Sequence, residues 1–257
     1  MATKILLHGS NGRMGKVISE SLKNNIDCFI VAGIDLNTEM TFGYPVFSSP
    51  FECDIDFDVI IDFSNTLAVP TICDYAAQQA KPIVIATTGL DDATKELYET
   101  LACKVPVFVS ANMSLGINML IQLAVQATSV LSKDFDIEIL EAHHNQKLDA
   151  PSGTAMMIAD AIKDSSEIPL EYTFSRHEVR EPRSKKQLGI HSIRGGTIVG
   201  DHTVYFAGKE EVLEITHRAQ SRNVFAQGAI AAAKYIRQLP AGLYTMKDLI
   251  NSHLSEQ

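Results

Sequence analysis

The 257-residue chain is long enough for one large domain or two modest ones, each with its own hydrophobic core. Hydrophobic residues make up 46% and charged residues 21%, which is the composition of a globular protein. The net charge of −9 argues against a nucleic-acid partner, because a general nucleic-acid binder carries a basic face.

The chain carries no sign of a membrane partner or an oxidising compartment. Its apolar runs are shorter than the ~18 residues that a membrane span needs, and the start MATKILLHGS lacks the pattern of a signal peptide. The four cysteines match no zinc or redox spacing. We therefore expect a cytoplasmic protein with reduced thiols.

The first half of the chain alternates apolar runs with helical patterns. Near-continuous runs rich in Val and Ile suit strands buried on both faces of a parallel sheet, and they occupy residues 4–9, 29–35, 58–64, 82–87 and 106–112. Helical periodicity separates them at residues 11–25, 66–80 and 91–103. This order predicts an α/β fold, a Rossmann-like parallel sheet with right-handed crossovers.

The pattern changes after about residue 113, where a second, α+β unit is expected. Helices are predicted at 117–131 and from Pro151 to Lys163, a half-solvated strand at 136–144, and an antiparallel hairpin at 203–208 and 210–219. The basic, Gly-ended segment 176–196 is expected to be a mobile loop.

The alanine-rich helix 223–239 is expected to return to the first unit. The predicted first domain is therefore discontinuous and comprises 1–113 and 224–257, whereas 114–223 form the second.

The glycine loop HGSNGRMG follows the first predicted strand and opens the first helix, where a dinucleotide pyrophosphate binds. Its spacing of Gly9, Gly12 and Gly15 also suits an ordinary strand-to-helix turn. The context favours the dinucleotide, because Asp35 ends the second strand about 20 residues later and can accept from ribose hydroxyls. ATTG (86–89) and SANM (110–113) end the fourth and fifth strands, at the edge where such sheets bind ligands.

The segment EAHHNQKLDAPSGTA (141–155) gathers two histidines, a lysine and a helix start. His143 and His144 point to opposite faces of a strand end, and no cysteine or carboxylate cluster supports them, so no metal is expected. One buried and one solvated histidine without chemistry is the open alternative. Lys147 and the helix start at Ser152-Gly153-Thr154 favour proton donation beside a bound carboxylate.

Six segments, in order and over nearly the whole chain, resemble the 4-hydroxy-tetrahydrodipicolinate (dihydrodipicolinate) reductase family: HGSNGRMGK, ATTG, SANMSLGIN, EAHHNQKLDAPSGTA, IRGGTIVGDH and RAQSRNVFAQGAIAAA. The resemblance implies NADH- or NADPH-dependent reduction of that cyclic dicarboxylate to tetrahydrodipicolinate, in diaminopimelate and lysine biosynthesis. It also implies a homotetramer that associates through the sheets of the second domain.

The resemblance assigns roles residue by residue. It implies that His143 is the proton donor or acceptor, assisted by Lys147, and that the substrate is held by His144, Ser152, Gly153 and Thr154. The cofactor-binding residues implied are Gly9, Ser10, Asn11, Gly12, Arg13, Met14, Gly15, Lys16, Asp35, Ala86, Thr87, Thr88, Ser110, Ala111, Asn112 and Met113.

Two positions depart from the family pattern. Leu36 follows Asp35 where many relatives carry arginine, and Met113 stands where relatives often show phenylalanine. Two alternative functions are another two-domain dehydrogenase, such as an aspartate or homoserine dehydrogenase, and a dinucleotide-sensing regulator without chemistry. The first does not explain the His-His-Lys segment, and the second would need a partner-binding element that the sequence does not show.

Overall fold

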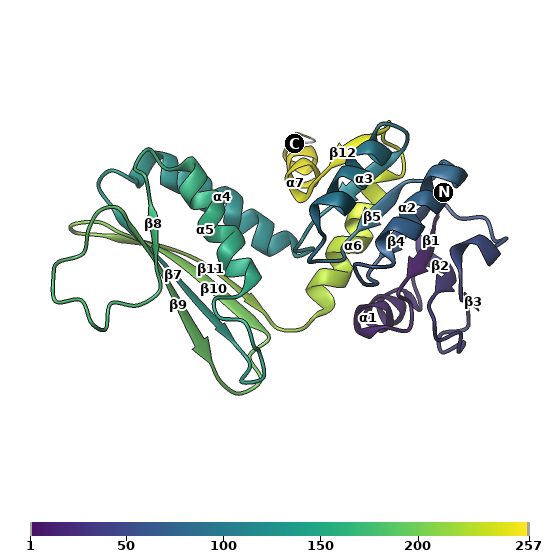
Figure 1. The fold of residues 1–257 in the computed structure, drawn as a ribbon, viewed down its shortest axis with the longest axis horizontal. Coiled ribbons are helices and arrows are strands. Elements are labelled where there is room, and N and C mark those ends of the chain that lie inside the picture. Colours follow the sequence, from purple (N-terminus) through teal and green to yellow (C-terminus); the bar gives the residue numbers. More distant parts are fainter. Residues whose placement is uncertain (1, 256–257) are drawn as a thin grey trace. The chain divides into compact units, whose positions relative to one another are not determined.

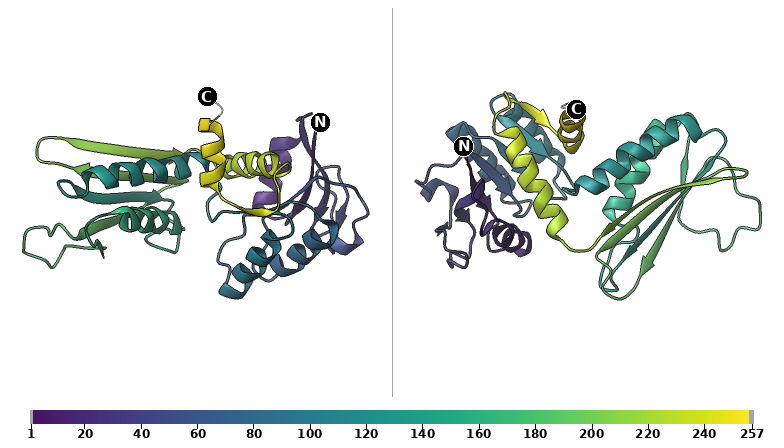
Figure 2. Two further views of the ribbon diagram at one scale, coloured as in Figure 1. Left: turned by 90° about the horizontal axis from the view of Figure 1, so that it is seen from above. Right: turned by 180° about the vertical axis from the view of Figure 1, so that it is seen from behind.

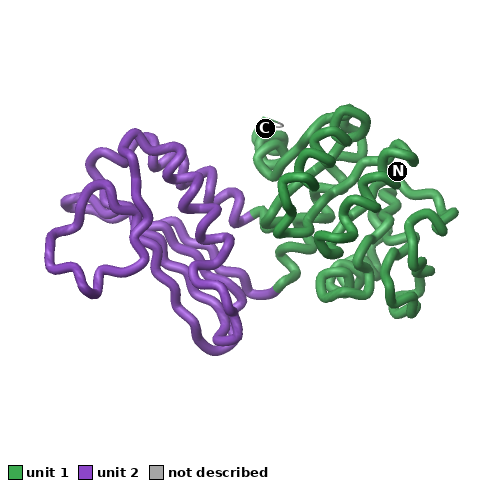
Figure 3. The backbone as a smooth tube through the Cα atoms, in the orientation of Figure 1, with its two compact units in different colours: residues 1–115, 222–257 green, residues 116–221 purple. Residues whose placement is uncertain are grey.

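The computed structural model describes residues 2–255, which form two compact units (Figure 3). Unit 1 comprises the described residues up to 115 and from 222 onward, and unit 2 is the continuous stretch 116–221. The chain therefore passes between the units at 115/116 and 221/222, where the sequence had suggested 113/114 and 223/224.

Unit 1 is built on a seven-stranded sheet in the order β12-β6-β5-β4-β1-β2-β3, and every pairing is parallel. The strands are β1 (Thr3–His8), β2 (Cys28–Ile34), β3 (Val46–Phe47), β4 (Val59–Asp62), β5 (Ile83–Ile85), β6 (Pro106–Val109) and β12 (Gly242–Tyr244). The predicted Rossmann-like sheet is confirmed. Its order reverses between β1 and β4, and the crevice at such a switch point is where open α/β sheets bind ligands.

Helices cover both faces of this sheet (Figure 1). Helices α1 (Arg13–Leu22) and α6 (Asn223–Ile236) share one core with β1 and β4, and α2 (Val69–Gln79) and α3 (Asp92–Ala102) share the other. The return of the alanine-rich helix to the first unit is confirmed. Two short elements complete the unit, the 3-10 helix η1 (Pro50–Glu52) and the final helix α7 (Met246–Ser255).

Unit 2 is a five-stranded sheet in the order β11-β10-β7-β9-β8, with two helices on one face (Figure 2). The strands are β7 (Asp136–His143), β8 (Glu171–Thr173), β9 (Gln187–Arg194), β10 (Gly200–Ala207) and β11 (Val212–Ala219). The helices are α4 (Leu115–Leu131) and α5 (Gly153–Ser165). The predicted antiparallel hairpin is confirmed as β10 and β11, and β9 runs parallel to both β7 and β8.

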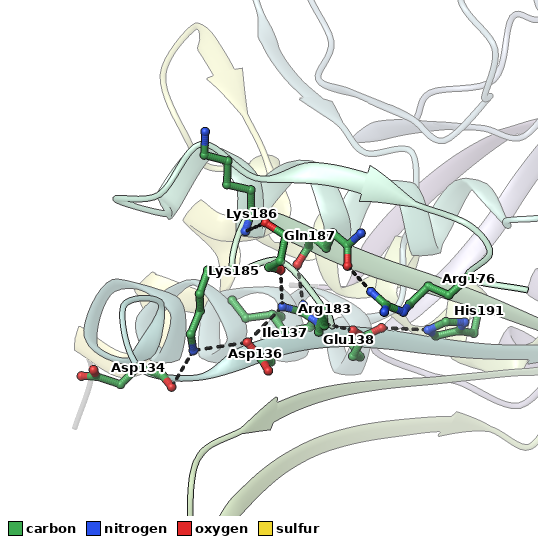
Figure 4. A network of polar contacts seen from close by, with 11 residues as sticks. Asp134, Asp136, Ile137, Glu138, Arg176, Arg183, Lys185, Lys186, Gln187 and His191 are labelled. Carbon is green, nitrogen blue, oxygen red and sulfur yellow. Dashed lines mark hydrogen bonds and ion pairs between the residues drawn. The ribbon is translucent and has the colours of Figure 1, made fainter. Parts of the chain in front are cut away.

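The prediction of a mobile loop over 176–196 is wrong for its second half, because residues 187–194 form β9. Leu188 and Ile190 of this strand are buried in the core, whereas His191 and Ile193 lie on the exposed face. The strand has three consecutive buried residues followed by three exposed ones, so its sequence shows no alternation that would indicate a strand. Arg183, in the preceding stretch, ties that stretch to Asp136 and Glu138 of β7 (Figure 4).

Within the described residues, no helix combines the length and the apolar character that a bilayer span requires.

Candidate active site

The glycine loop of unit 1 has the backbone geometry of a phosphate cradle. Gly9 has a positive φ of 78°, and a Cβ on it would lie 2.5 Å from the carbonyl oxygen of Phe63. A Cβ on Gly15 would lie 2.2 Å from the carbonyl oxygen of Gly9. Only glycine fits both positions, so the loop packs closely against the end of the sheet. It leads into the start of α1, where backbone N–H groups favour an anion.

The loop borders a cavity of about 560 Å³ at the carboxyl ends of β1, β2 and β4. Its lining includes Gly9, Gly12 and Asp35 among the predicted cofactor residues, together with His8, Leu36, Ser64 and Asn65. The Asp35 carboxylate is fixed by two backbone N–H donors, Asn11 at 2.9 Å and Asn37 at 3.0 Å. The glycine cradle, the cavity and the fixed carboxylate together fit a dinucleotide.

Not every predicted cofactor side chain faces this cavity. The Ser10 hydroxyl is fully buried and lies where a Cβ on Gly33 would be 2.5 Å away, so Ser10 can offer only its backbone to a ligand. Met14 packs on the core, whereas Arg13 and Lys16 are exposed. Asn11 also donates from its side chain to the carbonyl of Asn37 at 2.6 Å, which joins the loop to the residues after β2.

The sequence analysis missed a buried carboxylate, Asp62, at the end of β4. One of its oxygens lies 2.7 Å from Nδ1 of His8 and accepts from the Ser64 hydroxyl at 2.6 Å. The other accepts from the Thr87 hydroxyl at 2.6 Å. The Thr87 hydroxyl is therefore hydrogen-bonded within the protein. The Asp62 carboxylate links Thr87, after the end of β5, to His8 at the end of β1. Asp62 directly follows the apolar run 59–61, and this position could have indicated a carboxylate at the end of the strand.

The remaining predicted cofactor residues lie at the carboxyl ends of β5 and β6. Ala86 and Met113 are buried in the core that α6 completes, and Thr88 and Ala111 are exposed. The Ser110 hydroxyl donates to the carbonyl of residue 112 at 2.7 Å. The Asn112 side chain accepts from the N–H of residue 114 at 2.9 Å, so this turn is fixed by its own side chains.

In unit 2, His143 is the last residue of β7 and lies on the face covered by the helices. Its Nδ1 lies 2.6 Å from Oε2 of Glu141, two residues earlier on the same face. A Cβ on Gly200 would lie 3.0 Å from Nε2 of His143, so the absence of a side chain at Gly200 allows this strand to pack against the nitrogen. The ring is therefore held by Glu141 at Nδ1, and its Nε2 faces Gly200.

Glu141 is fully buried and is bound by the two terminal nitrogens of Arg194, at 2.8 and 2.7 Å. Its Oε1 also accepts from the backbone N–H of Ser152 at 3.1 Å. Burial opposes ionisation of this carboxyl, but hydrogen bonds from Arg194, Ser192, His143 and Ser152 outweigh burial and lower its pKa to about 2. The sequence analysis singled out neither Glu141 nor Arg194, although the i, i+2 spacing of Glu141 and His143 was visible.

Lys147 lies in the turn after β7, with most of its side chain covered. Its Nζ forms an ion pair with Oδ1 of Asp149 at 2.8 Å, and its backbone N–H donates to the carbonyl of His144. His144 is half-buried, unlike the buried His143, as expected for neighbours on opposite faces of a strand. Unit 2 therefore holds His143, Lys147 and the start of α5 in the short segment between β7 and α5.

Helix α5 begins as predicted, and Ser152 is its N-cap. The Ser152 hydroxyl accepts from the N–H of Ala155 at 3.1 Å and lies 3.2 Å from Nε2 of His202. Both polar groups of Ser152 are thus engaged inside the protein. A Cβ on Gly153 would meet nothing within 4 Å, so the space above the helix start is open beside Gly153 and the half-buried Thr154.

His202, which the sequence analysis also missed, packs edge-on against His143 with ring centroids 5.2 Å apart. Burial, reinforced by the electrostatic effect of the neighbouring His143, lowers the pKa of His202 to about 4. His202 is therefore neutral near pH 7, and His143 has a neutral imidazole and an ionised Glu141 as its ring neighbours.

Unit 1 is a parallel sheet with a glycine loop at its carboxyl edge. Unit 2 is a separate α+β unit that carries a histidine and a lysine before a helix start. These features define a two-unit oxidoreductase of the dinucleotide-binding class.

Comparison with known proteins narrows this class. Residues 3–113 match the family described as "Dihydrodipicolinate reductase, N-terminus", and residues 116–250 match "Dihydrodipicolinate reductase, C-terminus". The chain belongs to the dihydrodipicolinate reductase family, as the six sequence segments indicated.

Relatives of similar length support this membership. The 4-hydroxy-tetrahydrodipicolinate reductase of Caldanaerobacter subterraneus subsp. tengcongensis is 49% identical over 250 residues, which cover 97% of this chain and 99% of that protein. The reductase of the same name from Clostridium novyi (strain NT) is 44% identical with the same coverage. The solved structure of dipicolinate-bound dihydrodipicolinate reductase from Paenisporosarcina sp. TG-14 matches with a TM-score of 0.82 and 25% identity, over 95% of this chain and 98% of that one.

Proposed function

We propose that this protein reduces 4-hydroxy-tetrahydrodipicolinate to tetrahydrodipicolinate with NADH or NADPH, as a step of diaminopimelate and lysine biosynthesis. Family membership supports the reaction, and the dipicolinate in the structure of the Paenisporosarcina relative supports a small cyclic dicarboxylate as substrate. The observation that carries the proposal is His143, held at Nδ1 by an ionised carboxylate and followed along the chain by Lys147 and the start of helix α5.

The residues of unit 1 that would hold the cofactor are those of the glycine loop and of the strand ends beside it. A bound nicotinamide cofactor would supply the hydride. The backbone of residues 9–16 would face its pyrophosphate, and Asp35 would accept from the adenosine ribose hydroxyls, since Asp35 lines the cavity and its carboxylate is fixed by backbone donors.

The residues of unit 2 would hold the substrate and supply the proton. A substrate carboxylate would lie at the start of α5, near Gly153 and Thr154, because the positive end of the helix dipole favours an anion there. His144 would add a further contact, and the Lys147 ammonium would add positive charge while Asp149 holds it in place. His143 would donate the proton from Nε2, because Nδ1 is bound to Glu141. Ser152, with its polar groups engaged, would position this helix start.

A cytoplasmic homotetramer is part of the same proposal. The sheet face of unit 2 that the helices leave open carries the half-buried Leu140 and Tyr205 and the exposed Ile193. In a tetramer this face would be covered by other copies of the chain. Sedimentation is expected to give four times the chain mass of 28.2 kDa, and Tyr205→Glu is expected to give smaller species, because register places residue 205 beside Glu138 and Glu214.

The activity is tested by following the oxidation of NADH or NADPH with the fresh product of dihydrodipicolinate synthase as substrate. Rapid oxidation that requires this product, and that is lost in His143→Gln, is the expected result. Turnover with aspartate semialdehyde or oxaloacetate plus ammonia instead would support a homoserine- or aspartate-type dehydrogenase. Cofactor binding without any turnover would support a sensor.

A further inference from the structure

Glu141 lies in a buried environment, where its two oxygens contact Arg194, His143 and the backbone of Ser152. Oε2 accepts from Nη1 of Arg194 at 2.8 Å and lies 2.6 Å from Nδ1 of His143. Oε1 accepts from Nη2 of Arg194 at 2.7 Å and from the N–H of Ser152 at 3.1 Å. A single carboxylate thus contacts the histidine, the start of α5 and a strand that the sequence did not predict.

The ionised carboxylate decides which nitrogen of His143 carries a fixed proton. With a pKa of about 2, Glu141 has no proton to donate near neutral pH and can only accept. Nδ1 of His143 must therefore be the donor in this pair, and the proton that is transferred in the proposed reaction must be bound to Nε2. Nε2 is the nitrogen that faces Gly200.

Arg194 joins this carboxylate to the turn that carries the lysine. The parallel register of β7 and β9 pairs Arg194 with His143. Besides its two bonds to Glu141, Nη2 of Arg194 donates to the carbonyl oxygen of Asp149 at 2.6 Å. The side chain of Asp149 holds Nζ of Lys147 at 2.8 Å. One guanidinium is therefore linked to both proposed proton donors.

We infer that Glu141 and Arg194 are a positioning pair for the reaction: Glu141 fixes the tautomer and orientation of His143, and Arg194 fixes Glu141 together with the Lys147 turn. This inference rests on the proposed function, because it gives the pair a purpose only if His143 transfers a proton. A role in stability alone would not explain it well, since buried ion pairs contribute little net stability compared with apolar replacements.

Glu141→Gln separates the two roles by chemistry. The amide keeps one acceptor oxygen and replaces the other with an NH2 donor. If that NH2 stood at the Oε1 position, it would face two fixed donors, Arg194 and the Ser152 N–H. At the Oε2 position it faces Arg194 and His143, and His143 can adapt by accepting at Nδ1. The variant is therefore expected to invert the neutral tautomer, so that the proton moves to Nε2.

The dependence of kcat on pH is expected to change in the same variant. The titratable and charged groups around His143 are Glu141 from β7, Arg194 from β9, His202 from β10, and Lys147 with Asp149 from the turn. Removing the Glu141 charge leaves Arg194 uncompensated and places a donor against Nδ1. The pH above which kcat falls is expected to decrease, and kcat is expected to drop about 100-fold, within the range typical of general acid catalysis.

The direct test is nitrogen NMR of protein labelled with 15N-histidine, with the His143 signals assigned from the spectrum of His143→Gln. The wild-type protein is expected to show the Nδ1–H tautomer above pH 8, and Glu141→Gln is expected to show Nε2–H. The kcat profile between pH 5 and 9 is measured on the same samples. The tautomer is read without turnover, so it remains informative even if the proposed substrate is wrong.

A matched pair of arginine variants controls for simple loss of stability. Arg183 also binds β7, at its opposite end, with Nε at 2.7 Å from Glu138 and Nη1 at 3.0 Å from Asp136 (Figure 4). Arg194→Lys is expected to keep the Nδ1–H tautomer but lose the link to Asp149, lowering kcat about tenfold with an unchanged KM for NADH. Arg183→Lys is expected to leave kcat and its pH profile unchanged, with a comparable decrease in Tm.

Each outcome distinguishes the inference from the proposed function. Retention of the Nδ1–H tautomer and of the wild-type kcat profile in Glu141→Gln would overturn the inference while leaving the function intact. Equal kinetic effects of Arg183→Lys and Arg194→Lys would also overturn it, because they would reduce both arginines to structural supports. Absence of turnover in the wild-type protein, with the tautomer inverted as expected, would overturn the function and leave the positioning geometry standing.

Discussion

Replacing Leu36 by arginine is expected to shift cofactor preference toward NADPH. Leu36 follows Asp35 at the edge of the cavity in unit 1, and its side chain is 92% exposed. The substitution therefore removes no core contact, and the free energy of unfolding should change by less than about 0.5 kcal/mol. The new guanidinium would stand beside the Asp35 carboxylate, which two backbone donors already hold in place.

The size of the shift follows from the exposure of the site. In the wild-type protein Asp35 would repel a 2′-phosphate, but solvent and salt would limit that repulsion to about 1 kcal/mol. We therefore expect both cofactors to work, with NADH equal or modestly preferred. An exposed arginine–phosphate pair contributes a similar amount, so Leu36→Arg should raise the NADPH to NADH ratio of kcat/KM about fivefold. Asp35→Asn should give a comparable rise by removing the repulsion.

The assay is the initial rate with each cofactor at low and high ionic strength. The gain in Leu36→Arg should decline as salt rises, because the Debye length falls to about 10 Å at 0.1 M. An unchanged cofactor ratio in Leu36→Arg would show that residue 36 does not reach the 2′ position. A wild-type preference for NADPH of tenfold or more would show that Arg13 or Lys16 outweighs Asp35, and the reasoning would be wrong.

Three further predictions concern unit 2. His143→Gln and Lys147→Met should each lower kcat at least about 100-fold while leaving the Kd of NADH unchanged by fluorescence titration, and near-normal kcat in both would remove their assigned roles. The buried His202 has its pKa lowered to about 4, so its neutral form stabilises the fold above the unfolded pKa of 6.5 and this stability is lost as pH falls through 4. Urea unfolding should show a loss of about 3 kcal/mol across that window, and a slope unchanged in His202→Gln would contradict the assignment. Ser152→Ala should cost about 1 kcal/mol of unfolding free energy through the lost N-cap, and an unchanged urea midpoint would show that the cap is dispensable.

The parts of the fold that the sequence predicted are those with strong local patterns. The central strands of unit 1 read as continuous Val- and Ile-rich runs because both of their faces are buried. Strand β9 has one solvated face and carries His191, Ser192 and Arg194, so its composition resembled that of a loop. Strands β3 and β12 contain two and three residues, which is too short for any periodicity.

The candidate site was predictable where chemistry and sequence proximity coincide. His143, Lys147 and the start of α5 lie in one stretch, and the structure keeps them there. Arg194 lies 53 residues from Glu141, and only the pairing of β9 with β7 brings the two together. His202 likewise reaches Ser152 across 50 residues. Such partners depend on the strand order, which the sequence pattern did not reveal.

The discontinuity of unit 1 bears on the order in which the protein is made. Helix α6 contributes Ala229, Ala233 and Ile236 to the same core as Ile5 and Ile61, so the first strands lack part of their hydrophobic cover until the C-terminal region has been synthesised. Unit 2, by contrast, is one continuous stretch, complete once residue 221 has left the ribosome. The middle of the chain is thus expected to fold before its beginning. A nascent chain should acquire the unit that carries His143 and Lys147 first and its capacity to bind a dinucleotide last.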